Sequence, residues 1–244
     1  MPRRGTLRSN EPDVYGVPPD PRLSHAARIY GLTLIMAVIA LSQWILIGIF
    51  DDRTHKRRPE QYGWWLICTF MAVASVSWTK LGRKVPYNYI IIAAIVESST
   101  IYIALEQKHS AHMLVNIYAG TIVVALMLAS IIWGAYFPMF FVPGDLVLSL
   151  LVAISFIMIV LFFINILFID YIGLHYMVRN TFALVAVCMV MYTATIIHDR
   201  QFDVPKNEYL FLSVLQFFSY MILQERILGL AYRSTKKLKC EENT

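Results

Sequence analysis

The chain has 244 residues, of which 58% are apolar and only 15% are charged. A soluble domain is about 45–50% apolar and about 25% charged, so this composition excludes an ordinary soluble protein and indicates an integral membrane protein. The formal net charge of +5 comes from loops and tails, which favours contact with the lipid bilayer through anionic headgroups and argues against nucleic acid as a partner.

The chain begins with a tail and continues into a series of apolar segments. Residues 1–27 contain five prolines and almost no apolar periodicity, which predicts a disordered, Pro-rich cytoplasmic tail. A hydrocarbon core about 30 Å thick needs roughly 20 helical residues. Residues 28–232 are therefore predicted to form a transmembrane bundle, followed by a short basic tail at 233–244. The predicted spans are 29–50, 62–79, 89–105, 114–133, 146–168, 181–197 and 209–230.

The last predicted span is only marginally apolar. It contains Gln216, Ser219, Gln224, Glu225 and Arg226, and such a segment is stable in a bilayer only if its polar side faces other helices or water. Adjacent Glu225 and Arg226 are interpreted as a charge pair at the membrane interface. The expected fold is an all-α integral membrane protein, a six- to seven-helix transmembrane bundle with a semi-polar central last helix.

The number of spans depends on whether this last segment crosses the membrane. If all seven segments cross, Lys and Arg are evenly divided between the two sides, whereas a re-entrant last segment gives a clear cytoplasmic excess. The positive-inside rule favours the second arrangement, while a seven-helix bundle requires the first. The side of the C-terminus stays open at this point.

Three cysteines are scattered along the chain, with neither a disulfide framework nor a metal-binding spacing. The sequence also lacks the motifs of a zinc protease, a nucleophile elbow and a phosphate-binding loop. We therefore expect a protein that is not an enzyme and that has no resident metal or cofactor.

The last third also carries a motif with characteristic spacing. It consists of Tyr192-Thr193-Ala194-Thr195, Asp199-Arg200, Glu208-Tyr209-Leu210-Phe211 and Leu215-Gln216-Phe217-Phe218-Ser219. This resembles the C-terminal signature of the Bax inhibitor and lifeguard (TMBIM) family, which reads Phe-Asp-Thr-Gln, Asn-Arg, Glu-Tyr-x-Phe and Leu-Asn-Leu-Tyr-x-Asp. Arg83, Pro86 and Asn88 also resemble the Arg-x-x-Pro-x-Asn that precedes the third helix in many lifeguard proteins.

The resemblance covers about residues 25–232. It implies a location in the endoplasmic reticulum or Golgi, modulation of intracellular calcium leak, with transient Ca²⁺ as the ligand, and negative regulation of apoptosis. It also implies other membrane proteins or cell-death regulators as partners. The alternative is a non-conducting membrane adaptor that binds other membrane proteins.

The resemblance fails at two positions that matter for calcium. In Bax inhibitor proteins, two aspartates in the last two helices form a buried pair that is thought to sense pH and gate the leak. The matching positions here are Thr193 and Ser219. Hydroxyls can hydrogen-bond across helices, but they do not titrate as paired carboxylates do. The chain therefore resembles a divergent member that lacks both aspartates, with Thr193 and Ser219 as ion-path candidates.

Glu97 lies near the middle of the predicted span 89–105. A carboxylate there costs about 3 kcal/mol to insert, so it must be protonated, paired or in contact with water. It is the third ion-path candidate, as a ligand for a cation or proton facing the bundle interior. In the alternative, it is a protonated hydrogen-bonding group. A polar network that joins the helices is expected from Thr195, Gln216, Gln224 and Asn116, and close helix packing from Ala119, Gly120, Ala125 and Ala129.

Overall fold

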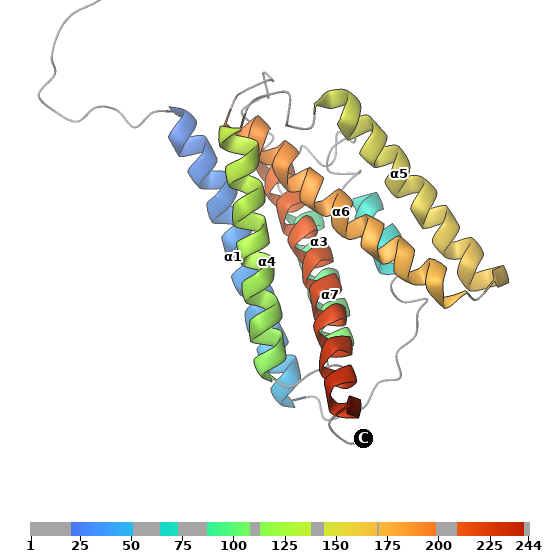
Figure 1. The fold of residues 1–244 in the computed structure, drawn as a ribbon. Helices are drawn as coiled ribbons and strands as arrows, with labels where there is room; N and C mark the ends of the chain where they lie inside the picture. The colour runs from blue at the N-terminus through green and yellow to red at the C-terminus, as the bar shows by residue number, and fades with distance from the viewer. Residues whose placement is uncertain are drawn as a thin grey trace, which may run out of the picture.

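The computed structural model describes residues 21–50, 64–72, 87–107, 113–137, 144–169, 171–198 and 209–241. Within these ranges the protein is helical and contains no strand, which confirms the all-helical prediction. Residues 64–72 form a short helix. The other elements are α1 Pro21–Phe50, α3 Tyr87–Gln107, α4 Met113–Tyr136, α5 Asp145–Ile164, the π-helical η2 Asn165–Ile169, α6 Ile172–Ile197 and α7 Tyr209–Glu241 (Figure 1).

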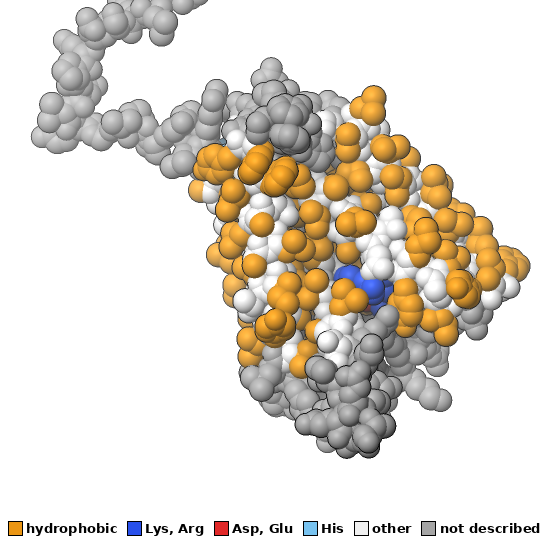
Figure 2. Space-filling view, in the orientation of Figure 1, with side chains coloured by type: hydrophobic (Ala, Val, Ile, Leu, Met, Phe, Trp, Pro, Cys, Tyr) orange, Lys and Arg blue, Asp and Glu red, His pale blue; other side chains and the backbone are white. Residues whose placement is uncertain are grey.

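Four helices in the described part of the chain are long and apolar enough to cross a membrane. They are His25–Trp44, Ile117–Tyr136, Ser149–Ile169 and Ile172–Ile197, and Tyr89–Ala104 is a shorter apolar helix. Apolar side chains cover most of the face seen in Figure 2, where a small group of basic atoms lies among them. An apolar exterior of this kind is what lipid requires.

Helix α7 is the central helix. It packs against α1, α3, α4 and α6, while α5 packs on α6 at the edge of the molecule (Figure 1). Most of its side chains from position 210 to position 228 are buried, although many of them are polar. This is the position predicted from the composition of residues 209–230, because polar side chains avoid lipid by facing other helices.

Helices α1, α6 and α7 extend furthest beyond their predicted bounds. Helix α1 begins at Pro21, so residues 21–27 belong to a helix and not to the tail; proline fits the first helical turn because its missing N–H is not needed there. Helix α6 begins at Ile172, nine residues before the predicted start at Thr181. Helix α7 continues to Glu241 through the basic tail, where lysines are good helix formers.

The closest helix packing occurs between α4 and α6 at Gly134. A Cβ atom placed on Gly134 would lie 2.3 Å from the carbonyl oxygen of Met191. The hydroxyl of Thr195 in α6 lies 3.1 Å from the carbonyl of Gly134 and 2.9 Å from that of Met191 in its own helix, and its one proton is shared between them. Of the small residues predicted to allow close packing, Ala119 is buried, but Ala125 and Ala129 are exposed.

The turn between α5 and α6 is closed by one buried side chain, Asn165 in η2. Its amide nitrogen donates to the carbonyl of Tyr171 over 3.1 Å, and its carbonyl oxygen accepts from the Tyr171 backbone N–H over 3.0 Å. Both backbone groups of Tyr171 therefore have partners immediately before α6 begins.

We expect Asn165→Ala to lower the free energy of unfolding by about 1–3 kcal/mol, because it removes the two hydrogen bonds between the buried Asn165 side chain and the Tyr171 backbone, each worth about 0.5–1.5 kcal/mol. Unfolding in mixed micelles with an added denaturing detergent measures this change. Ser42→Ala is the control, since Ser42 is exposed and, among the described residues, its hydroxyl donates to Ile39 of its own helix. Equal stabilities of the two variants would contradict the role assigned to Asn165.

Candidate functional site

One polar cluster lies where α7 meets α1 and α6, with Gln216 at its centre. The Gln216 amide nitrogen donates to the Thr193 hydroxyl of α6 over 3.4 Å. Its carbonyl oxygen lies 3.3 Å from the Thr33 hydroxyl of α1, whose one proton is shared with the carbonyl of Ile29 in its own helix at 2.9 Å. The Ser213 hydroxyl, one turn earlier in α7, lies 2.7 Å from the carbonyl of Tyr209 in its own helix and 3.3 Å from that of Ile29 in α1, and its one proton is shared between them. These contacts connect α1, α6 and α7 through polar side chains, which is how such side chains stabilise a membrane bundle.

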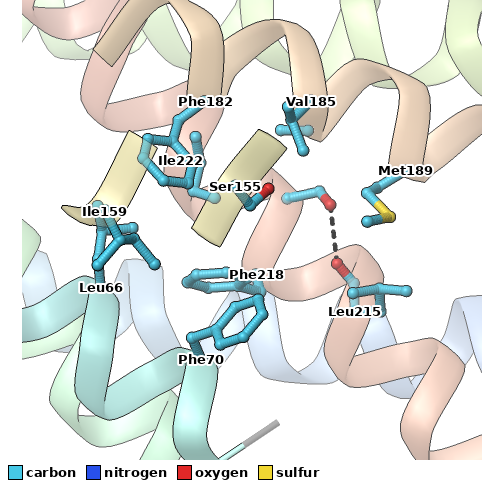
Figure 3. A pocket seen from close by; sticks show the side chains of 12 residues that line it. Leu66, Phe70, Ser155, Ile159, Phe182, Val185, Met189, Leu215, Phe218 and Ile222 are labelled. Carbon is cyan, nitrogen blue, oxygen red and sulfur yellow. Dashed lines mark hydrogen bonds between the residues drawn. The ribbon is translucent and has the colours of Figure 1, made fainter. Parts of the chain in front are cut away.

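Ser219 lies in a different environment, a cavity of about 60 Å³ between α5, α6, α7 and the short helix 64–72 (Figure 3). The polar side chains that line the cavity are Ser219 and Ser155, and the other lining residues are apolar. Each serine donates to a carbonyl of its own helix, Ser219 to Leu215 over 2.9 Å and Ser155 to Leu151 over 2.8 Å. The cavity therefore offers little to hold an ion.

Thr193 and Ser219, the two positions that the family resemblance assigns to aspartates, therefore lie in different environments and do not contact the same groups. Thr193 donates to Val190 over 2.9 Å and accepts from Gln216, whereas Ser219 bonds within α7. Each hydroxyl uses its one proton within its own helix. Neither supplies a carboxylate, which is the group that binds calcium strongly.

The remaining residues of the predicted polar network have separate surroundings. The Thr195 hydroxyl joins α6 to α4 through the Gly134 carbonyl. Gln224 is buried, and its amide nitrogen lies 4.0 Å from the position that a Cβ on Gly120 would take. Asn116 belongs to α4, but its side chain lies outside the described residues.

Glu97 does not face the interior. Its side chain is exposed on α3, and one carboxylate oxygen accepts a hydrogen bond of 2.7 Å from the amide nitrogen of Gln43 in α1. The structure therefore places Glu97 beside α1 and not beside Thr195, Gln216 or Ser219. This position separates it from the polar groups between α6 and α7.

A buried ion pair joins α6 to α7. The Arg179 guanidinium donates to a carboxylate oxygen of Glu225, and the two side chains are only 5% and 2% exposed. Arg226 is buried as well, at 6% exposed. The predicted interfacial pair is therefore a buried arrangement in which Glu225 pairs with Arg179. Removing one partner of such a pair leaves the other charge buried without its main compensating contact, which is costly.

No protein-family model and no curated protein matches this chain. The motif residues named above are therefore the support for the lifeguard resemblance. In the described residues, no group of three or more His, Cys, Asp and Glu side chains could hold a metal ion.

Arg179 was missed because the predicted loop before α6 contained it. The adjacent Arg179 and Asn180 look like the end of a loop, yet Leu174, Met177 and Val178 precede them and continue the apolar pattern of α6. Extending the span to Ile172 would have placed an arginine inside a membrane helix. An intramembrane arginine calls for an acidic partner, and Glu225 lies in the polar last helix.

Proposed function

We propose that this protein is a multi-pass protein of the endoplasmic reticulum or Golgi that modulates calcium leak and restrains cell death. The lifeguard-like motif supports the class of function. The observation that carries the proposal is the buried Arg179–Glu225 pair between α6 and α7. Charged side chains inside a membrane protein are costly, and they commonly mark ion pathways or gates.

In this proposal the pair is the contact that closes the leak. Helices α6 and α7 are joined by Arg179–Glu225 and, farther along, by the Gln216–Thr193 hydrogen bond. A cation can pass between the two helices only if these contacts open. The ion pair then takes the place of the acidic pair of the family as the closing contact. Thr193 also accepts from Gln216 across the two helices, whereas Ser219 bonds within α7.

Calcium efflux from vesicles that contain the purified protein tests the proposal. Glu225→Gln removes the charge that holds Arg179, so we expect efflux to rise roughly tenfold, equal to a loss of about 1.4 kcal/mol from the closed state. Glu97→Gln is the matched control, because it removes a carboxylate outside the α6–α7 contact. It should leave efflux unchanged. Equal efflux from wild type and Glu225→Gln would contradict the closing role.

The second candidate is a non-conducting adaptor. It is favoured by the neutral hydroxyls of Thr193 and Ser219 and by their bonds within their own helices. An adaptor gives no efflux above protein-free vesicles for wild type, Glu225→Gln and Glu97→Gln alike, at every pH. This result would contradict the calcium-leak proposal and support the adaptor proposal.

A further inference from the structure

The outer face of α3 is exposed along its whole apolar stretch. The exposed positions recur every three or four residues, so they form one stripe on the helix, made of Ile90, Ala93, Ala94, Glu97, Ser98 and Ile101. The opposite side of α3 packs against α1 and α7. This stripe is called the α3 outer face below.

Glu97 lies at the middle of this face and at the middle of the apolar helix Tyr89–Ala104. Gln43 donates to one of its oxygens, and this is the hydrogen bond that the structure gives Glu97 among the described residues. A carboxylate offers about four acceptor positions, so most of its capacity is open. Charged groups at this depth nearly always face protein or water, because lipid offers them no partner.

The side chains around Glu97 allow another helix to come close. Ala93, Ala94 and Ser98 are small and exposed, and Ala94 and Ser98 are four residues apart, on the same side of the helix. Small residues at this spacing let the backbones of membrane helices approach each other closely. Ile90 and Ile101 bound the face with larger apolar side chains.

We propose that the α3 outer face binds a transmembrane helix of another protein, which carries a lysine or arginine at mid-membrane that pairs with Glu97. Charge complementarity selects this occupant. A second copy of the chain does not supply it from the described residues, because Arg179 and Arg226 are buried and the other Lys and Arg residues lie toward the N-terminal end of α1 or in the last turns of α7, away from mid-membrane. The proposal does not depend on the calcium leak, since Glu97 lies apart from the α6–α7 contact.

The test uses two synthetic transmembrane peptides of about 20 leucine and alanine residues. One carries a central lysine, and the other has leucine in its place. The full-length protein is labelled with a donor fluorophore and the peptide with an acceptor, and energy transfer is measured in vesicles. We expect wild-type protein to bind the lysine peptide at least tenfold more tightly than the leucine peptide. Glu97→Gln should remove this preference, and Thr121→Ala, which changes an exposed hydroxyl on α4, should keep it.

Three outcomes would overturn the proposal. The first is equal binding of both peptides to wild type, and the second is a lysine preference that survives in Glu97→Gln. The third is Glu97-dependent self-association of labelled wild type with no lysine preference, which assigns the face to a second copy. Unfolding of Glu97→Gln in mixed micelles is measured in parallel. This shows whether the variant is folded, so that a loss of binding is not caused by misfolding. Because efflux is a separate measurement, failure of this proposal leaves the leak proposal standing.

Discussion

Arg179→Ala should lower the free energy of unfolding by about 3–5 kcal/mol, because it leaves the Glu225 carboxylate buried without its arginine. The two side chains are 5% and 2% exposed, so water cannot easily take the place of the lost guanidinium. Glu225→Ala should cost a similar amount, since it leaves the arginine in the same position. Such losses are large compared with the total stability of most proteins, about 5–15 kcal/mol.

Denaturing-detergent titration of the purified protein in mixed micelles measures this loss, and two further variants interpret it. Arg28→Ala removes an exposed arginine from the start of α1 and should change stability by less than about 0.5 kcal/mol. Arg179→Met combined with Glu225→Leu replaces the pair by apolar side chains, which often restores or increases stability. If the double variant were as unstable as Arg179→Ala, the pair would contribute to the free energy of unfolding by more than the neutralisation of each charge by the other.

The same variants separate stability from gating in the efflux measurement. Glu225→Gln keeps the shape of the glutamate and an amide that can accept from Arg179, so its structural cost is smaller than that of Glu225→Ala. An efflux increase in a Glu225→Gln protein that remains folded reports opening between α6 and α7. An increase seen only together with unfolding would assign the pair a purely structural role.

Much of the fold follows from the sequence because lipid imposes simple rules. Long apolar segments must be helical in a bilayer, and Gln216 and Glu225 require that the last helix be shielded from lipid. The ends of the helices are predicted less accurately from the sequence, because Arg179 and Asn180 in α6 have the composition of a loop. Their place in a helix is marked by a tertiary contact that composition does not show, the pairing of Arg179 with Glu225 forty-six residues later.

The site is harder to predict than the fold, because the direction in which a side chain points is a tertiary property. Helix α3 is apolar on nearly every side, so its sequence does not show whether Glu97 faces the interior or lipid. The packing of α3 on α1 and α7 decides this and turns Glu97 outward. The sequence does show that Thr193 and Ser219 lack carboxylates, but it does not show that Ser219 lines an apolar cavity while Thr193 contacts Gln216.

Gly134→Val should lower the stability of the bundle by about 1–3 kcal/mol or more, through overpacking between α4 and α6. The added Cβ would lie 2.3 Å from the Met191 carbonyl oxygen and 2.9 Å from the Cβ of Ala194. These neighbours are a backbone atom and the first side-chain atom of a helical residue, so neither can rotate away. The two helices must separate, which also stretches the Thr195 hydrogen bond to the Gly134 carbonyl.

Gly31→Ala and Gly134→Ala form the matched pair for this measurement, since both add one methyl group to a helical glycine. A Cβ on Gly31 meets nothing within 4 Å, so Gly31→Ala should be neutral or stabilising by up to about 1 kcal/mol through helix propensity. Gly134→Ala gains the same propensity but must displace the Met191 backbone, so its stability should fall below that of wild type. If both alanine variants were equally stable in the detergent titration, α4 and α6 would not be in close contact at Gly134. That result would contradict the prediction that the stability of the bundle depends on the α4–α6 contact at Gly134.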